Sequence, residues 1–220
     1  QIDPQHQTGQ VQVQVIDDEP RYEITPDCAY DFIETGTFPA LAEQGILYHG
    51  TLGLRNDVSR DAFIELAKNP GLSTFVDVNL RAPWWQKNDV YHWLQQARWV
   101  KLNQDELRLL GFTENDTQQA MSALLSRFQL EQVILTQGGE GASVLTSQDD
   151  FHNVVPAKLT HFVDTVGAGD AFSAIYIHGL LAGWSIPDSL KVAQQFASGI
   201  IGLRGATPGD PGFYQAFVNN

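Results

Sequence analysis

The most informative stretch of this 220-residue sequence is Asp164-Thr-Val-Gly-Ala-Gly-Asp-Ala-Phe172, where two glycines stand directly before an apolar segment. The backbone amides in the first turn of a helix have no acceptor within the helix, and the helix dipole is positive there. The stretch therefore predicts an anion-binding site. Asp170 would lie in that first turn, where its carboxylate can accept a proton from a hydroxyl that attacks a phosphoryl group. The alternative is a glycine-rich loop whose acidic residues only complement the helix dipole.

Upstream of this stretch, short apolar runs alternate with segments of helical periodicity. The runs are Ile46–Tyr48, Thr74–Val78, Trp99–Leu102 and Val133–Thr136, and two of the helical segments are Ala62–Ala67 and Met121–Phe128. Near-continuous apolar strands that alternate with amphipathic helices predict a mostly parallel sheet flanked by helices, and hence an α/β fold. In such a sheet, ligands bind beyond the carboxyl ends of the strands.

The C-terminal half adds two further features. Ser143–Leu145 and Phe151–Val155 are predicted to form an antiparallel pair at one edge of the sheet. The last third is predicted to be helical over Gly167–Gly183 and Pro187–Leu203.

The N-terminal segment has a different pattern. Val11–Val15 alternates apolar and polar residues, a turn-like Asp17-Asp18-Glu19-Pro20 follows, and Arg21–Thr25 resembles a second short strand. Two such strands are not stable alone, so they must pack on something else. We therefore predict a small β appendage with its connections over residues 1–38, and an α/β domain over residues 39–220.

The composition excludes several classes of protein. Acidic residues outnumber basic ones by 26 to 13, and the formal net charge of −13 argues against a nucleic-acid-binding protein, which needs a basic surface. The single cysteine, Cys28, excludes an internal disulfide framework and fits a reducing compartment. Because no run of 18 apolar residues exists, we expect no membrane association and a soluble, cytoplasmic protein.

Five segments together resemble one known family. Asp164–Phe172 resembles the C-terminal signature of the ribokinase-like, or PfkB, carbohydrate kinases. The other four, in the family's order, are Asp77-Val-Asn-Leu-Arg-Ala-Pro-Trp-Trp85, Val100-Lys-Leu-Asn-Gln-Asp-Glu106, Thr136-Gln-Gly-Gly-Glu-Gly141 and Arg204-Gly-Ala-Thr-Pro208. The resemblance implies a ribokinase-like fold and transfer of the γ-phosphoryl group of ATP to a sugar hydroxyl, most similar to the fructokinases. It also leaves open a 2-keto-3-deoxygluconate kinase, a riboside kinase, or a nucleotide- or sugar-binding fragment with impaired catalysis.

The resemblance also implies roles for individual residues. Asp170 would be the catalytic base and contact the sugar hydroxyl, and the amides of Gly167, Ala168 and Gly169 would surround the γ-phosphate. The residues that would bind ATP are Asn103, Glu106, Thr136, Gly138, Gly141 and Ala206. Glu106 would also hold Mg²⁺, through water, and Asp164 would lie near a monovalent cation such as K⁺. Asn79 and Arg81 would contact the sugar.

Several of these residues also fit a purely structural explanation. Asn103, followed three residues later by Glu106, fits a capping box that opens a helix at Gln104. Thr136–Gly141 fits a glycine-rich hairpin turn, and Asp164 fits a helix N-cap. Arg81 fits a surface arginine that stacks on Trp84 or Trp85.

The sequence departs from the family at its start. It has no match to the family's N-terminal third, which carries a Gly-Gly sugar-binding motif, and it begins with Gln1 while its only methionine is Met121. We therefore expect an upstream segment to be missing. A sheet without its central strands would expose unpaired edges. The resemblance implies that Val11–Val15 and Arg21–Thr25, within residues 1–38, are the strands of a lid that covers the sugar. A homodimer through these lid strands is a further expectation from the resemblance.

Overall fold

The computed structural model describes residues 1–16, 19–38, 43–157 and 162–218. Its main element is a six-stranded sheet in the order β3-β4-β5-β6-β7-β8. The strands are β3 (Gly45–Gly50), β4 (Leu72–Asp77), β5 (Trp99–Asn103), β6 (Gln132–Thr136), β7 (Ala142–Thr146) and β8 (Phe151–Val154). Strands β3 to β6 pair in parallel, and β7 and β8 add an antiparallel pair at one edge. The predicted mostly parallel sheet with an antiparallel edge pair is confirmed.

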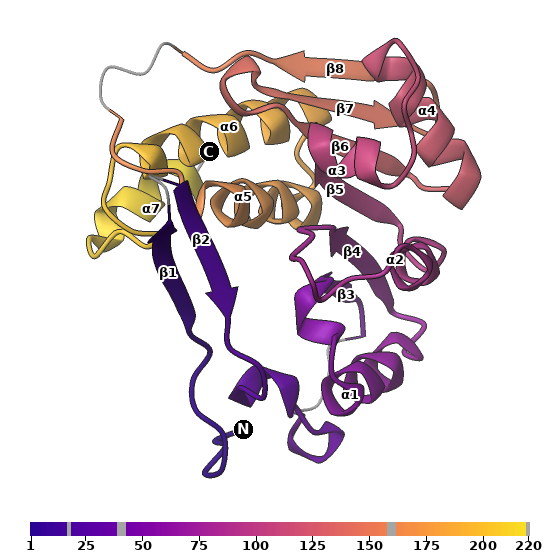
Figure 1. Cartoon of the computed structure of the whole chain (residues 1–220). Helices are drawn as coiled ribbons and strands as arrows, with labels where there is room; N and C mark the ends of the chain where they lie inside the picture. The colour runs from indigo at the N-terminus through magenta and orange to yellow at the C-terminus, as the bar shows by residue number, and fades with distance from the viewer. Residues whose placement is uncertain (17–18, 39–42, 158–161, 219–220) are drawn as a thin grey trace.

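Helices cover both faces of this sheet (Figure 1). They are α1 (Asp57–Ala67), α2 (Lys87–Leu94), α3 (Gln104–Leu109), α4 (Thr117–Phe128), α5 (Ala168–Ala182), α6 (Ile186–Ile201) and α7 (Pro211–Val218). Figure 1 shows α1, α2 and α4 on one side of the sheet, and α5 and α6 on the other. In the part of the chain that the structure describes, none of these helices is long and apolar enough to cross a bilayer.

The core has two layers because successive side chains of a strand point to opposite faces. Val76 and Val100 pack with α2, α3 and α4, whereas the neighbouring Phe75 and Trp99 pack against α5 and α6. Both faces are therefore apolar, which explains why the strand sequences lack alternation. The observed strands begin and end within two residues of the predicted bounds.

The N-terminal strands form a separate two-stranded antiparallel sheet. β1 (Val11–Ile16) pairs with β2 (Glu19–Ile24), with Val11 opposite Ile24 and Ile16 opposite Glu19. The prediction of a four-residue turn was wrong at Glu19 and Pro20, which already pair within β2, because a two-residue connection can close a hairpin. Asp17 and Asp18 lie outside the described residues.

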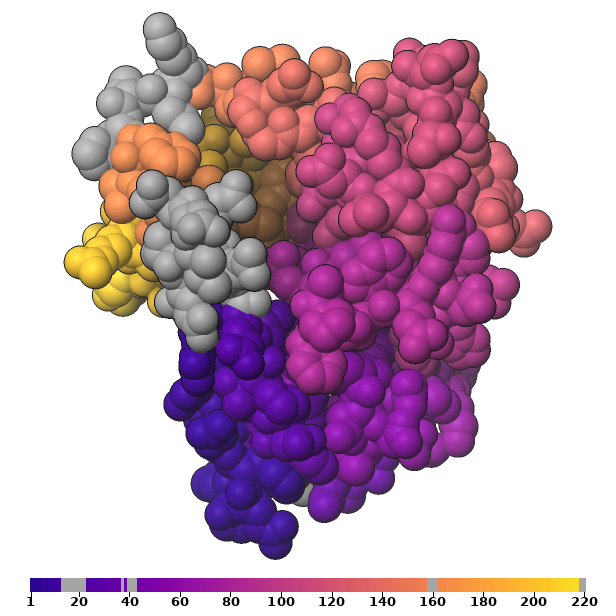
Figure 2. Space-filling view, in the orientation of Figure 1, coloured from indigo at the N-terminus to yellow at the C-terminus, as the bar shows by residue number. Residues whose placement is uncertain are grey.

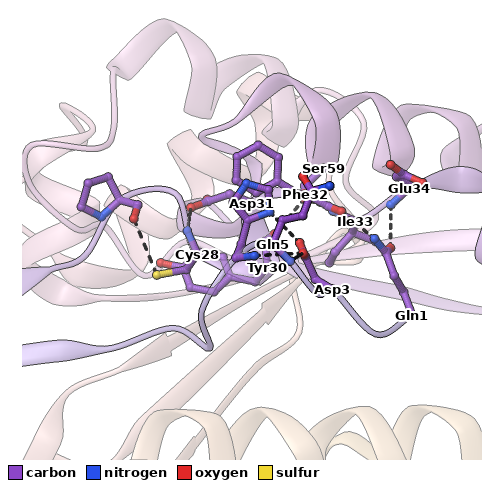
Figure 3. A network of polar contacts seen from close by, with 12 residues as sticks. Gln1, Asp3, Gln5, Cys28, Tyr30, Asp31, Phe32, Ile33, Glu34 and Ser59 are labelled. Atoms are coloured by element: carbon purple, nitrogen blue, oxygen red, sulfur yellow. Dashed lines mark hydrogen bonds and ion pairs between the residues drawn. The ribbon is translucent and has the colours of Figure 1, made fainter.

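The segment that follows this two-stranded sheet is tied to the α/β body by polar contacts. Ser59 Oγ, in α1, donates to the carbonyl of Tyr30 at 2.8 Å and accepts from the amide of Ile33 at 2.9 Å (Figure 3). Asp31 accepts two hydrogen bonds from Arg55, from Nε at 2.8 Å and from Nη2 at 2.7 Å. The segment after β2 therefore has a fixed place on the body.

His49 is a buried histidine with a testable effect on stability. Its ring packs against Phe63 and Trp93, and burial lowers its pKa from 6.5 to about 4. The neutral form is therefore favoured in the folded state. The stability that this provides is complete above pH 6.5 and is lost as the pH falls towards 4, because only the unfolded chain then gains the proton.

We expect His49 alone to lower the free energy of unfolding by about 3 kcal/mol between pH 8 and pH 4. Chemical denaturation at a series of pH values, on wild type and His49→Phe, measures this difference. His49→Phe should have a correspondingly flatter pH dependence, because it lacks the buried imidazole. Equal pH slopes for wild type and His49→Phe would contradict the assignment.

Candidate active site

The N-terminus of α5 has the backbone geometry that the sequence predicted. Gly167 is the N-cap residue, with φ 80° and ψ −4°, and Asp170 lies exposed in the first turn. A Cβ at Gly167 would overlap the side chain of Ala206 and lie 2.7 Å from its Cα. Glycine is required here both by the left-handed backbone and by this close approach of residue 206.

Two of the three predicted amides are available to a ligand. The amide of Ala168 donates to the carbonyl of Thr165 at 3.2 Å. Within the described residues, the amides of Gly167 and Gly169 have no backbone acceptor. An anion at this helix end would therefore bind mainly to the amides on either side of Ala168. Figure 2 shows the surface hollowed on this side of the molecule, with atoms in the orange-brown colours of the α5 and α6 layer at its floor.

Beneath this turn lies a polar group that we call the Asp77 cluster, of which Asp77, Lys101 and Ser173 are buried and Tyr48 is 43% exposed. It consists of Asp77, Lys101, Ser173 and the hydroxyl of Tyr48, on β4, β5, α5 and β3 respectively. Asp77 Oδ2 accepts from Lys101 Nζ at 2.7 Å, from Ser173 Oγ at 2.7 Å and from the Tyr48 hydroxyl at 3.3 Å. Burial and the nearby carboxylates of Asp77 and Asp170 raise the pKa of Tyr48. Tyr48 therefore stays protonated and donates.

Lys101, Ser173 and Tyr48 are residues of this cluster for which no role was predicted. A signal was present, since Asp77 and Lys101 are charged residues within or beside apolar strands. Charged side chains are rarely buried unless they are paired. Their partners could not be read from the sequence, because they lie on different strands.

Asn103 and Glu106 join the end of β5 to the start of α3. Asn103 Oδ1 accepts from the amide of Glu106 at 2.9 Å, and Glu106 Oε2 accepts from the amide of Asn103 at 2.8 Å. The capping box is therefore confirmed. Glu106 Oε1 also accepts from the amide of Leu80 at 2.8 Å. Burial is the main cause that raises the pKa of Glu106, and the negative charge of Asp77 adds to it.

The chemistry of these side chains fits a hydrated divalent cation better than a direct protein chelate. In the described ranges, no three His, Cys, Asp or Glu side chains lie close enough together to hold a metal ion. Magnesium usually keeps several waters and binds one or two carboxylates together with substrate phosphates. Glu106 could supply one such carboxylate, through its remaining lone pairs and a water molecule.

The predicted nucleotide loop connects the antiparallel strands β6 and β7. The amide of Gln137 donates to the carbonyl of Gly141 at 2.8 Å, and Gly138 and Gly141 have φ values of 56° and 101°. The prediction that this segment forms a glycine-rich hairpin turn is therefore confirmed. Thr136 Oγ1 lies 3.5 Å from the carbonyl of Leu102. The contact of Thr136, Gly138 and Gly141 with a nucleotide stays a prediction.

Asp164 lies before α5 but does not cap it. Its Oδ1 accepts from the amide of Val166 at 2.8 Å, and its Oδ2 accepts from the amide of Gly205 at 3.3 Å. The prediction of an N-cap was wrong, because the helix begins later in the chain, after Gly167. Asp164 instead joins the loop before α5 to the loop that carries Ala206.

The loop after β4 contains both predicted sugar contacts. Asn79 is partly buried and has a φ of 39°, and Arg81 is exposed. Among the described residues, Arg81 has no cation–π contact with Trp84 or Trp85, so the alternative of a stacked arginine is not observed, and the guanidinium over the ring of Trp84 is that of Arg55, at 4.4 Å. Arg81 can therefore reach a ligand from the surface, and its contact with a sugar stays a prediction.

Comparison with known proteins shows the family of this chain. Residues 1–211 match the pfkB family of carbohydrate kinases. The chain belongs to this family. As a pfkB family member, it carries the expected ribokinase-like fold, which is confirmed by solved structures. It is similar to fructokinase from Vibrio cholerae O395, crystallised with fructose, ADP and calcium, at 26% identity and a TM-score of 0.80 over 98% of this chain and 75% of that one.

Two curated relatives have names that describe sugar or sugar-acid kinases. This chain is 27% identical to 5-dehydro-2-deoxygluconokinase from Clostridium beijerinckii, over 72% of this chain and 49% of that protein. It is 30% identical to fructokinase from Klebsiella pneumoniae over 72% of its own length and 53% of that protein. The chain thus spans about half the length of the curated relatives it matches.

Proposed function

We propose that this chain transfers the γ-phosphoryl group of ATP to a hydroxyl of a sugar. The observation that carries the proposal is the first turn of α5, where the exposed carboxylate of Asp170 lies beside the available amides of Gly167 and Gly169. A base and an anion-binding site are the two groups that phosphoryl transfer to an alcohol requires at one place.

Each part of the proposed site has a chemical task. Asp170 accepts the proton of the sugar hydroxyl as it attacks, and the two glycine amides stabilise the charge on the transferred phosphoryl group. Glu106 and Asn103 hold the metal–phosphate end of the nucleotide, and Thr136, Gly138, Gly141 and Ala206 line its remainder. A bound Mg²⁺–ATP complex supplies the phosphoryl group and neutralises its negative charge.

Fructose is the first sugar to test. The support comes from the relatives, among them fructokinases and one kinase of a keto-sugar acid. Asn79 and Arg81 would contact the sugar, and an arginine in this place suits an acidic sugar as well as a neutral one. Keto-sugar acids are therefore the second candidate class, and ribosides are the third.

The remaining assignments belong to the same proposal. Asp164 would lie near a monovalent cation such as K⁺, which one fructokinase structure of V. cholerae contains. A homodimer through β1 and β2 fits a two-stranded sheet that pairs, among the described residues, only with itself. Use of ATP and a single cysteine both fit a cytoplasmic enzyme.

The test combines turnover with binding. ADP release is measured with MgATP and each of fructose, ribose, an aminoimidazole riboside and a 2-keto-3-deoxy sugar acid, and MgADP affinity is measured by calorimetry on the same protein. We expect sugar-dependent ADP release, fastest with fructose. Nucleotide binding without release for any sugar would instead support a binding fragment with impaired catalysis.

A further inference from the structure

The Asp77 cluster joins the first turn of α5 to the strands of the sheet. Ser173 follows Asp170 by three positions and Gly169 by four, so it lies on the same side of the helix. Its Oγ is 2.7 Å from Asp77 Oδ2 and 3.0 Å from the carbonyl of Gly169. A serine hydroxyl has one proton to donate, and the charged, nearer acceptor forms the stronger hydrogen bond. Ser173 therefore donates to Asp77.

Asp77 is itself held in place from two other strands. Lys101, from β5, forms a buried ion pair with it, and the hydroxyl of Tyr48, from β3, donates to the same oxygen. Lys101 also lies directly under the first turn of α5, because its Nζ would be 3.6 Å from a Cβ placed on Gly169. The carboxylate that accepts the hydrogen bond of Ser173 is thus fixed relative to three neighbouring strands.

The rest of α5 is held mainly by apolar contacts. Phe172 and Ile175 pack in the core between the sheet and α6. Such contacts are non-directional, so they tolerate small shifts along and around the helix axis. A hydrogen bond from Ser173 to a fixed carboxylate holds this end of α5 in one position and one orientation. Phosphoryl transfer depends on this, because a misplacement of about 1 Å can cost about 100-fold in rate.

We propose that Ser173 is a positioning residue, which fixes the first turn of α5 through Asp77 and thereby aligns Asp170 and the amides of Gly167 and Gly169. This rests on the proposed phosphoryl transfer at that turn. Ser173 does not touch the reacting atoms in this scheme. Its hydroxyl acts through the backbone of the helix that carries them.

The same helix offers a matched control. Tyr176 donates from its hydroxyl to Gln132 Oε1, on β6, at 2.7 Å, and both residues are buried. Tyr176→Phe and Ser173→Ala therefore each remove one buried hydrogen bond of the same length between α5 and the sheet. Only Ser173 lies next to the first turn, since its Oγ is 3.0 Å from the carbonyl of Gly169.

The experiment compares wild type, Ser173→Ala and Tyr176→Phe in urea unfolding and in sugar-kinase kinetics. We expect similar shifts of the unfolding midpoint for the two variants. Ser173→Ala should lower kcat by about tenfold or more and change the KM for the sugar by less than about threefold, whereas Tyr176→Phe should keep kcat within about twofold. Equal effects of both variants on kcat would overturn the proposal, because the bond would then be only structural.

Measurements of nucleotide affinity can test the role of Ser173 even if the proposed kinase activity is absent. If wild type releases no ADP with any sugar, the proposed function fails, and the affinities for MgATP and MgADP decide the role of Ser173. Ser173→Ala should then lower the affinity for MgATP by about fivefold more than the affinity for MgADP, because only ATP has a γ-phosphate to contact the displaced turn. Tyr176→Phe should change neither affinity. The proposal is overturned if Ser173→Ala lowers both affinities equally or lowers neither. It is also overturned if wild type binds neither nucleotide.

Discussion

Replacement of Asp170 by asparagine is expected to lower kcat by about 100-fold or more, while the affinity for MgADP changes less than about threefold. The carboxylate is exposed in the first turn of α5, so asparagine can occupy the same place without a packing change. The amide cannot accept the proton of the sugar hydroxyl at neutral pH. Initial rates with MgATP and the best sugar, together with calorimetric titration of MgADP, measure the two effects separately.

A matched control for Asp170 is Asp188, an exposed acid in the first turn of α6. Asp188→Asn loses a comparable interaction with a helix dipole, about 0.3–1 kcal/mol, and should leave kcat unchanged. A loss of turnover and of nucleotide affinity by the same factor in Asp170→Asn would argue that Asp170 supports the structure of the turn. Asp170 would then not be the base.

Replacement of Gly167 by alanine is expected to remove most nucleotide binding and to lower the free energy of unfolding by about 2–5 kcal/mol. Two costs add up. The left-handed backbone at φ 80° costs a residue with a Cβ about 1–2 kcal/mol, and the new methyl group overlaps Ala206, which adds about 1–3 kcal/mol of overpacking. Either the turn or the loop of Ala206 must move, and both are proposed to contact ATP.

Gly183, just after α5, provides the control. Its φ is 71°, and a Cβ there would meet nothing within 4 Å. Gly183→Ala should therefore cost only the backbone strain, about 1–2 kcal/mol, and leave MgADP affinity unchanged. Urea unfolding and calorimetry on both variants make the comparison. Similar losses of stability and affinity in the two variants would show that Ala206 does not press on the turn.

Much of the fold could be predicted because it depends on residues that are close in sequence. The apolar runs of β4, β5 and β6 indicated strands buried on both faces, and two core layers cover them. The capping box of Asn103 and Glu106 could be predicted because its two hydrogen bonds join residues three positions apart. Gly167 and Asp170 were recognised for the same reason.

Other features were wrong or missed because they depend on contacts across the fold. Asp164 fitted an N-cap locally, yet one of its oxygens binds the amide of Gly205, 41 positions away. Arg81 was the nearest arginine to Trp84 in sequence, but Arg55 from another loop lies over that ring. The exposed position of Arg81 and the hydrogen bonds from Arg55 to Asp31 depend on contacts between loops that are distant in sequence.

By itself, the sequence determined the layers of the fold and the helix end that carries Asp170. These rest on the periodicity of apolar residues and on glycines before an apolar helix, which are features of a few neighbouring residues. The family was indicated by the resemblance of five short motifs, and the family match over residues 1–211 shows it. Only the tertiary structure decided that Ser173 donates to Asp77 from 96 positions away and that Lys101 neutralises the same carboxylate. Strand order and helix packing bring these side chains together. A buried charge is stable only where such distant partners meet.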